Sequence, residues 1–288
     1  MSRYLFVYFT GNEPEQERIH FAISKDGYHF TPLNQNQPII TQTKGKKCVR
    51  DPYIFKGKDG YYYIIGTDMM CNEGWESNHA LITWKSSDLI SWEDETIIDM
   101  FDLGKEFADT TRAWAPQAIW DDNEGKYMLY WAHSTKRHNT AGLYYAYSSD
   151  MKSITTPKPL YCRNIQTIDG DIVYNENDQL YYLFFKHDED QTIAYVTSKN
   201  LTGPYTDEPI RVSLATSGVE GSQVYRLENS TYIMVMDEYS KGRFFMQETT
   251  DLKHYTPVQD YDMNFGPRHG SIVAITDKEY DALMSHYG

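Results

Sequence analysis

The chain has 288 residues, of which 40% are hydrophobic and 24% charged, and this ordinary composition predicts a globular protein of one large domain or two small ones. Its formal net charge of −14 would repel a phosphate backbone and argues against nucleic acid as a partner. Three cysteines without a CxxC pair argue against a disulfide framework or a zinc site. The aromatic share of 15% favours β structure and suits sugar rings.

The N-terminal segment, residues 4–9, is an apolar run that we interpret as a β-strand. It is too short for the hydrophobic region of a signal peptide, and no apolar stretch approaches the ~20 residues that a membrane helix needs. We therefore expect a soluble, cytoplasmic protein without a membrane partner. A secreted or periplasmic location is the alternative if a leader has been removed.

Five segments then repeat one pattern, a short strand followed by a Ser/Thr-rich turn and an apolar or aromatic residue. Their turn residues are Asp26, Asp88, Asp150, Asn200 and Asp251. A second pattern of strand, polar turn and aromatic strand precedes four of them, and its first copy is RDPYIFKGKDGYYYII. A unit of about 50 residues with four short strands is typical of a β-propeller blade, so five units predict a five-bladed ring.

The end of the chain supplies the strand that the first unit lacks. The segment GPRHGSIVAIT, residues 266–276, is predicted to join the N-terminal blade and close the ring. A short helix should follow, with Asp277 as its N-cap. We thus expect an all-β protein in which residues 1–288 form a single five-bladed β-propeller. A β-sandwich is the alternative, but it does not explain five similar units.

The innermost strands of a propeller all run the same way along its axis, so the residues that begin them should ring one mouth of the central channel. The repeat places Asp51, Ala115, Asp169, Glu220 and His269 at these equivalent positions. Asp169 and Glu220 begin adjacent blades, whereas Asp51 begins a blade two steps from each. Two close acids make it harder for both to ionise, so one keeps its proton while the distant acid stays charged. Glycoside hydrolysis needs such a pair, and the wide spacing favours inversion.

Each of these acids also has a structural interpretation, because an Asp before a strand often bonds its own backbone. Three acids at equivalent positions of the repeat favour a catalytic role. Asp171 is expected on the same side of the strand as Asp169 and deeper in the channel, where it could share the role of Asp169. The further candidates for substrate binding are Trp114, Trp75, Arg268, His269 and Asp171. Trp114 fits a core position equally well. No metal site is predicted, with His269 as the one candidate ligand, because a single His is more often structural.

Together these motifs resemble glycoside hydrolase family 43 along essentially the whole chain. RDPYIF is similar to the motif that carries the family's general base, which implies that role for Asp51. TIDGDIVYNENDQLYYLFF resembles the segment of the acid that modulates the pKa, here Asp169, and VEGSQVYRL resembles that of the general acid, here Glu220. WAPQAIW resembles a blade start, and RHGSI resembles the closing strand, where a His lines the channel. The acid Asp171 departs from the family pattern and leaves the modulator open between Asp169 and Asp171.

The resemblance implies an inverting glycoside hydrolase that acts on plant-type polysaccharides or their oligosaccharides. It implies no required cofactor, although some members bind a structural Ca²⁺ in the channel. α-L-Arabinofuranosides are the leading substrates, with β-xylosides and β-galactosides as alternatives. An invertase-type β-fructosidase also has five blades, but its N-terminal Asn-Asp-Pro nucleophile and Glu-Cys acid are missing here. A propeller that only binds sugar or protein is the non-enzymatic alternative. The sugar, exo or endo action and the oligomeric state are left open.

Overall fold

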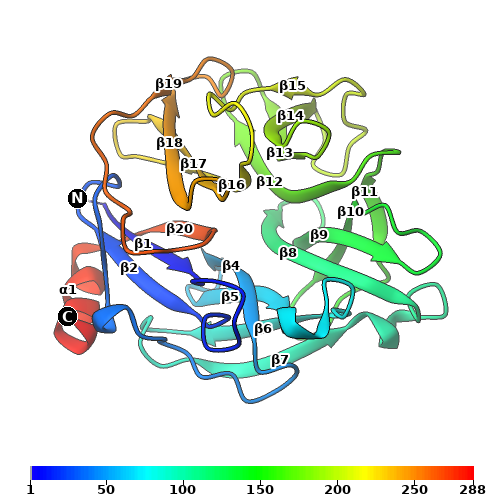
Figure 1. The fold of residues 1–288 in the computed structure, drawn as a ribbon, viewed down its shortest axis with the longest axis horizontal. Helices are drawn as coiled ribbons and strands as arrows, with labels where there is room; N and C mark the ends of the chain where they lie inside the picture. Colours follow the sequence, from blue (N-terminus) through cyan, green and yellow to red (C-terminus); the bar gives the residue numbers. More distant parts are fainter. Residues whose placement is uncertain (1) are drawn as a thin grey trace.

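The computed structural model describes residues 2–288 and contains five four-stranded antiparallel sheets arranged around a common centre (Figure 1). Each sheet is one blade, and its innermost strand lies next to the axis of the ring. Adjacent innermost strands also contact one another around the channel. This arrangement confirms the predicted five-bladed propeller and excludes the β-sandwich.

The five blades are numbered here in chain order, and their strands are given from the axis outward. Blade I contains β20 (Gly270–Ile275), β1 (Arg3–Tyr8), β2 (His20–Ser24) and β3 (Phe30–Pro32). Blade II contains β4 (Val49–Lys56), β5 (Tyr62–Asp68), β6 (Ala80–Ser86) and β7 (Glu93–Asp99). Blade III contains β8 (Thr110–Asp121), β9 (Lys126–Thr135), β10 (Gly142–Ser148) and β11 (Lys158–Tyr161). Blade IV contains β12 (Thr167–Asn175), β13 (Leu180–His187), β14 (Thr192–Ser198) and β15 (Ile210–Arg211). Blade V contains β16 (Glu220–Arg226), β17 (Tyr232–Glu238), β18 (Arg243–Thr249) and β19 (Thr256–Pro257).

The two ends of the chain close the ring in blade I, as the sequence predicted. Strand β20 pairs antiparallel with β1, with Tyr4 opposite Ala274 and Tyr8 opposite Gly270. A Cβ at Gly270 would lie 2.0 Å from the carbonyl oxygen of Val7, so this close approach admits only glycine. Figure 1 shows β20 and β1 side by side although they stand at opposite ends of the sequence.

The hydrophobic core consists of five clusters, each between two neighbouring blades. Strand β5 shows why the sequence produces this arrangement. Tyr62 and Ile64 pack toward blade I, whereas Tyr63 and Ile65 pack toward blade III. Successive side chains of a strand point to opposite faces, so a blade buried on both faces needs an unbroken apolar run. The aromatic surplus of the sequence fills these interfaces.

The repeated Ser/Thr-rich turn joins the third and fourth strands of each blade. In blade II the Asp88 carboxylate accepts hydrogen bonds from the backbone N–H groups of Ile90 and Ser91, at 2.9 and 2.7 Å. The hydroxyl of Ser86 accepts a further bond from the backbone of Leu89. These bonds satisfy the turn backbone locally, which explains why the same residue types recur.

One α-helix, α1 (Asp277–Tyr287), ends the chain at the rim of the ring beside blade I (Figure 1). The predicted N-cap Asp277 is wrong by one residue. Thr276 caps the helix and forms a capping box with Glu279, because its hydroxyl reaches the N3 backbone. Leu283 anchors the helix in the core cluster between blades I and II. No helix within residues 2–288 is long and apolar enough to cross a membrane.

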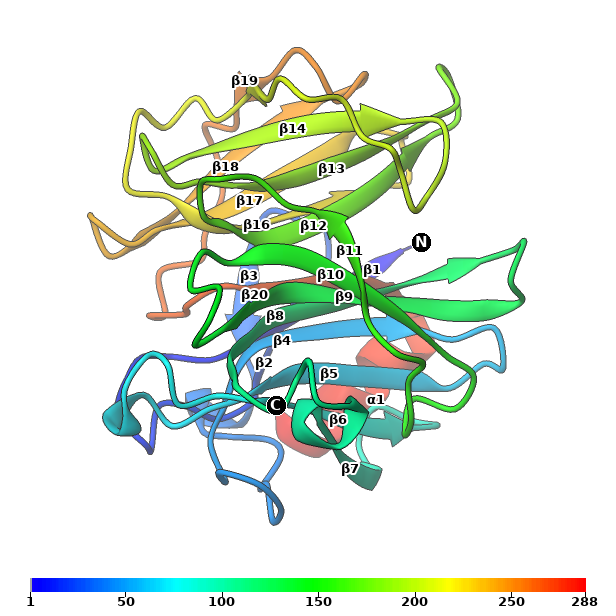
Figure 2. The same ribbon diagram turned by 90° about the vertical axis from the view of Figure 1, so that its right-hand side faces the viewer.

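Short connections lie at one end of the ring and longer loops at the other. Figure 2 shows the hairpin turns that link the first and second strands of blades II to IV at one end. The loops that precede the inner strands gather at the opposite end. The 3₁₀ helix Met100–Leu103 lies in such a loop, between β7 and β8, whereas Cys71–Glu73 lies in the loop between β5 and β6. A third 3₁₀ helix, Asn34–Asn36, lies in the loop between β3 and β4. The predicted residues Asp51, Asp169, Glu220 and His269 lie at the start of inner strands at the end with the longer loops, and Trp75 lies in one of these loops.

Candidate active site

Four inner strands begin with the same irregularity. In β4, β8, β12 and β16 the pairing with the second strand shifts register within the first few residues, which is the mark of a β-bulge. A left-handed residue lies in each bulge: Asp51 (φ 51°), Ala115 (φ 46°), Asp169 (φ 56°) and Gly221 (φ 56°). Non-glycine residues adopt this conformation only where the surroundings hold it, so the bulges are specific features that re-aim side chains at the channel mouth.

The bulges correct the repeat alignment of the three acids. Asp51 and Asp169 are structurally equivalent, and the residue equivalent to them in blade V is Gly221. The prediction that Glu220 occupies the equivalent position is therefore wrong by one residue. Glu220 instead matches Arg50, which precedes the bulge of blade II. A Cβ at Gly221 would lie 2.1 Å from the imidazole of His269, and this contact excludes any side chain at the bulge.

All three acids nevertheless face one pocket at the channel mouth. Its lining residues are Arg50, Asp51, Met69, Trp75, Trp114, Ile168, Asp169, Glu220 and His269. The pocket therefore unites six of the eight residues predicted from the sequence. Of the two tryptophans, Trp75 is 49% exposed, and its ring meets that of Trp114 edge to face at 6.1 Å between centroids. They form an aromatic wall suited to a sugar ring.

Asp51 is held as a carboxylate. Its Oδ1 lies 2.9 Å from Nε2 of His269, and its Oδ2 accepts a 2.8 Å hydrogen bond from the hydroxyl of Thr67. Burial opposes the charge, but the bond and charge of His269, with Arg50 and Thr67, outweigh it and lower the pKa of Asp51 to about 2. Each carboxylate oxygen keeps a lone pair for a further hydrogen bond, such as one from water.

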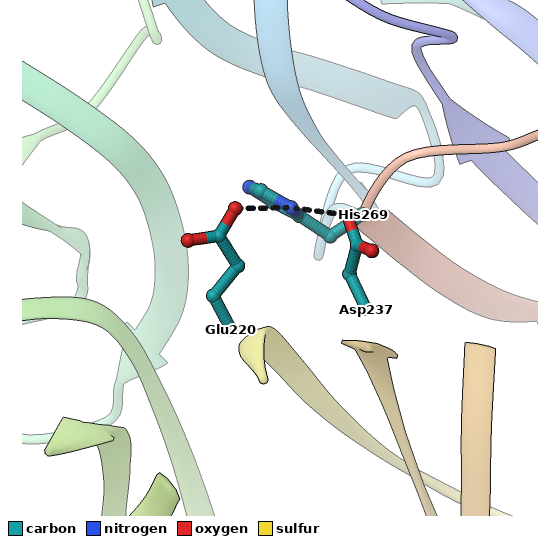
Figure 3. Close-up of side chains that lie close together, drawn as sticks. All are labelled: Glu220, Asp237 and His269. Carbon is teal, nitrogen blue, oxygen red and sulfur yellow. Dashed lines mark hydrogen bonds and ion pairs between the residues drawn. The ribbon is translucent and has the colours of Figure 1, made fainter. Parts of the chain in front are cut away.

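His269 lies at the centre of the site, between blades V and II. Figure 3 shows its ring between the carboxyl groups of Glu220 and Asp237. Its Nδ1 is 3.3 Å from Asp237 and 3.9 Å from Glu220, and its Nε2 pairs with Asp51. Burial disfavours a charged ring, but the hydrogen bonds to Asp237 and Asp51 prevail and raise the pKa of His269 to about 10. The ring is thus an imidazolium at neutral pH.

The carboxyl group of Glu220 lies between two cations. Lys186 on β13 contacts Oε2 at 2.9 Å, and Arg268 contacts Oε1 at 2.8 Å. Arg268 also donates to the buried Asp237, so the guanidinium orients both acids. The side chain of Glu220 keeps 18% of its surface exposed and can therefore meet a bound sugar.

Asp169 faces a different set of neighbours from Asp51. Its Oδ2 accepts a 2.9 Å hydrogen bond from the backbone N–H of Gly221. Burial, with the nearby carboxylates of Glu220 and Asp51, raises the pKa of Asp169 to about 6, against the opposing charges of His269 and Lys186. Asp169 therefore exchanges a proton near neutral pH and can respond to the charge of Glu220.

Asp171 lies deeper in the channel and outside the pocket lining. It is 3% exposed, and its Oδ2 accepts a 2.7 Å hydrogen bond from the backbone of Val224. Burial raises the pKa of Asp171 to about 7, against hydrogen bonds from Val224 and Gln117. Gln117 is fixed in turn by the hydroxyl of Tyr130, 2.6 Å from its amide oxygen. The structure thus separates Asp171 from the other seven predicted residues and gives it structural partners.

The candidate metal ligand His269 belongs to a compact donor set. Glu220, Asp237 and His269 each place one atom within 4.8 Å of the others. The set does not fit a metal, because the guanidinium of Arg268 already pairs with both acids and both ring nitrogens of His269 face carboxylates. An imidazolium has no lone pair to offer a cation.

Sequence reasoning missed three polar residues on second strands. Thr67, Lys186 and Asp237 are buried and contact Asp51, Glu220 and His269, respectively. Each is the cross-strand partner of the residue just before a bulge: Thr67 of Arg50, Lys186 of Ile168 and Asp237 of Glu220. A polar residue near the end of an apolar second strand is the signal that could have found them.

The imidazole also limits the separation of the two outer acids. It lies 2.9 Å from Asp51 and 3.9 Å from Glu220. Because an imidazole spans about 2 Å between its nitrogens, the two carboxyl oxygens lie at most about 9 Å apart. This limit is compatible with the ~6.5–9.5 Å at which inverting glycosidases hold their acid and base.

Comparison with known proteins adds a family match and distant relatives. A family model described as a probable glycosyl hydrolase domain, related to glycosyl hydrolase family 43, matches residues 1–281. An α-L-arabinofuranosidase of Bifidobacterium longum is 22% identical over 238 residues, which cover 71% of this chain and 22% of that protein. The chain thus spans about a fifth of that relative's length.

Solved structures agree on the fold. An endo-1,4-β-xylanase from Bacteroides thetaiotaomicron superposes with a TM-score of 0.63 at 14% identity and covers 93% of each chain. A thermostable family-43 glycoside hydrolase superposes with a TM-score of 0.57 at 17% identity, covering 75% of this chain and 73% of the other. At such identities these likenesses show the propeller fold.

Proposed function

The chain belongs to the glycosyl hydrolase 43-related family, and from that premise we propose that it is an inverting glycoside hydrolase of plant-type glycans, with α-L-arabinofuranosides as its favoured substrates. One observation carries the proposal. The carboxylate of Asp51 and the carboxyl group of Glu220 face one pocket on either side of His269, at most about 9 Å apart, which is compatible with the spacing of inverting glycosidases.

In this proposal Asp51 acts as the general base. Its low pKa keeps it ionised, and a free lone pair accepts the proton of a water that attacks the anomeric carbon. The imidazolium of His269 orients the carboxylate and holds its charge. A sugar stacked on the wall of Trp75 and Trp114 would be positioned for this attack.

Glu220 acts as the general acid and donates its proton to the leaving oxygen. Because its carboxyl group contacts Lys186 and Arg268, the leaving group has to take the place of one of these cations when substrate binds. Asp169 lies next to it and titrates near neutral pH, which suits a residue that modulates proton transfer. The proposed reaction uses side chains alone and needs no redox cofactor.

The choice of sugar rests on the Bifidobacterium longum relative, whose name gives α-L-arabinofuranosidase activity. β-Xylosides and β-galactosides, as the alternative substrates, belong in the same substrate screen.

The proposal is tested by turnover of 4-nitrophenyl glycosides and arabino-oligosaccharides. We expect α-L-arabinofuranoside to be hydrolysed, with Asp51→Asn and Glu220→Gln each lowering kcat/KM about 100- to 10,000-fold. The matched control is Glu176→Gln, because this exposed acid makes only a 3.8 Å ion pair with Arg226. Proton NMR of the newly formed anomer should show inversion. A retained anomer, or no turnover of any arabinoside, xyloside or galactoside, would contradict the proposal.

A further inference from the structure

A second cavity, of about 720 Å³, opens at the same end of blade III as the active-site pocket. The loop after β7, the hairpin end between β9 and β10, and the loop after β11 surround it. Its volume falls in the range of ~300–1,000 Å³ typical of ligand pockets. None of its lining residues belongs to the active-site pocket. The mechanism above does not use them.

In two polar side chains of this cavity, one nitrogen is buried without a hydrogen-bond partner among residues 2–288. His133 is 4% exposed, and its Nδ1 is buried without a hydrogen bond. Nη1 of Arg163 is likewise buried without a partner. Burial lowers the pKa of His133 to about 4 against a weaker opposing charge from Asp109, so the ring is neutral and able to hydrogen-bond. Unpaired buried groups of this kind destabilise a fold unless a ligand or water completes them.

Charge gives the cavity its chemical preference. Two arginines, Arg163 and Arg137, and one acid, Glu106, line it, in a protein whose net charge is −14. The guanidinium of Arg137 is neutralised by two hydrogen bonds to Asp109, at 2.8 and 2.9 Å. Arg163 makes no ion pair with any residue in the described range 2–288. It is therefore the guanidinium left to bind an outside anion, for which its planar fork suits a carboxylate.

Aromatic and amide groups supply the surface for a sugar. The ring of His133 packs between Phe107 and Tyr144, with centroids at 5.5 and 4.8 Å. Tyr144 is half-buried and offers a stacking face. The side chains of Asn139 and Asn164 add hydrogen-bonding amides to the lining. This mixture of aromatic face, amide and guanidinium fits a carboxylated sugar better than a neutral one.

One arginine joins this cavity to the active site. Arg112 donates to the carbonyl oxygen of Asn139 at 2.8 Å, and its guanidinium lies 5.0 Å from the ring centroid of Trp114. Asn139 lines the cavity and Trp114 lines the active-site pocket. The two sites therefore share a wall about one side chain thick, and one glycan could reach both.

We propose that the cavity on blade III binds a uronic acid residue of the glycan whose neighbouring sugar is cleaved at Asp51 and Glu220. Arg163 receives the carboxylate, Tyr144 stacks on the ring, and His133 hydrogen-bonds a hydroxyl. The inference rests on the proposed function for the identity of the glycan, which is thereby an acidic branched polysaccharide.

The test measures binding in the full chain that carries Asp51→Asn, so that hydrolysis does not interfere. The probes are a glucuronic-acid-bearing xylo-oligosaccharide and its methyl ester, titrated calorimetrically. We expect the acid to bind at least about tenfold more tightly than the ester. Equal affinity for the acid and the ester would overturn the proposal, and this comparison needs no change in the cavity.

Matched arginine variants locate the carboxylate. Arg163→Gln should remove the preference for the acid, about tenfold, while Arg137→Gln should change it less than about threefold because Arg137 is already paired. An unchanged preference in Arg163→Gln would also overturn the proposal. Turnover of the 4-nitrophenyl arabinofuranoside, xyloside and galactoside is assayed separately in wild type. Uronate binding without turnover would refute the proposed function and leave the site standing, and turnover without uronate binding would do the reverse.

Discussion

Blades II and IV hold an aspartate at the same place in the same bulge, yet the two carboxyl groups differ in charge. Asp51 and Asp169 have φ values of 51° and 56°. Hydrogen bonds and cations lower the pKa of Asp51 to about 2 against burial, whereas burial and nearby carboxylates raise the pKa of Asp169 to about 6. Since the backbone conformation and the residue type are the same, the neighbouring groups decide whether each aspartate is protonated or ionised near neutral pH.

The neighbours differ because the ring is asymmetric. Asp51 touches the imidazolium of His269 directly and the hydroxyl of Thr67 on its own blade. Asp169 touches the backbone of Gly221, one residue after Glu220. The blade next to each aspartate therefore sets its chemistry, which is how a repeated fold can produce a base and a proton-exchanging acid from one motif.

Removal of the imidazolium of His269 should have the largest effect on the difference between the two aspartates. We expect His269→Gln to lower kcat/KM by roughly 100-fold or more, because Asp51 loses its main charge partner. Loss of the cation raises the pKa of Asp51, so the acidic limb of the pH–rate profile should move to higher pH. His254→Gln, at an exposed turn, is the control. An unmoved acidic limb would show that His269 does not hold the charge of Asp51.

The second change targets the other aspartate. Asp169→Asn removes a negative charge beside Glu220 and should make the acid ionise more readily. The alkaline limb should therefore move to lower pH, with a fall in kcat of about 10- to 100-fold. The pH dependence of kcat measures both effects. If the limb stays in place while Asp171→Asn moves it, the modulator is Asp171.

A smaller effect is expected from the hydroxyl on the second strand. Thr67→Val deletes the 2.8 Å hydrogen bond to Asp51, together with the 2.8 Å bond that the hydroxyl accepts from the backbone N–H of Ala115, and leaves His269 in place. The acidic limb of the pH–rate profile should move slightly to higher pH, and kcat/KM should fall by less than about tenfold. Thr83→Val is the matched control, because Thr83 lies on β6 of the same blade as Thr67 and its buried hydroxyl donates to the backbone carbonyl of Met151 in blade III. An equal loss in both variants would indicate a structural effect alone.

Substitution of Asp171, which lies deeper in the channel than the pocket, should have the smallest effect on activity and a larger effect on stability. Burial raises the pKa of Asp171 to about 7 in the folded protein, from about 3.9 in the unfolded chain. Folding thus favours the protonated form, and its contribution to stability is complete below pH 4 and is lost as pH rises toward 7. Asp171→Asn lacks this loss, so its melting temperature should gain on wild type between pH 4 and 7. Parallel melting curves across that range would refute the raised pKa.

The sequence predicted the fold well because its signals are local. Turn residues such as Asp88 bond their own backbone, and strands such as β5 alternate between two neighbouring blades, so the repeat is readable without the structure. Closure by residues 266–276 followed from counting strands. The N-cap of α1 was missed by one residue because Thr276 and Asp277 are both good caps, and only the position of Glu279 decides between them.

The site was predictable only in part. Asp51, Asp169 and Glu220 were brought to one mouth by the ring, but the bulges that set their register leave no periodic trace in the sequence. Lys186 and Asp237 depend on that register, because each lies across the sheet from a residue just before a bulge. Partners fixed by long-range pairing are the part that a single sequence does not display.

The contrast between the two aspartates is tested most directly by a carbon-detected NMR titration of the carboxyl groups in wild type, with Asp51→Asn and Asp169→Asn to assign the signals. The structure predicts that Asp51 stays ionised down to about pH 2 and that Asp169 takes up a proton near pH 6. Two aspartates that titrate together near pH 4, or in the reverse order, would contradict the division of roles between blades II and IV.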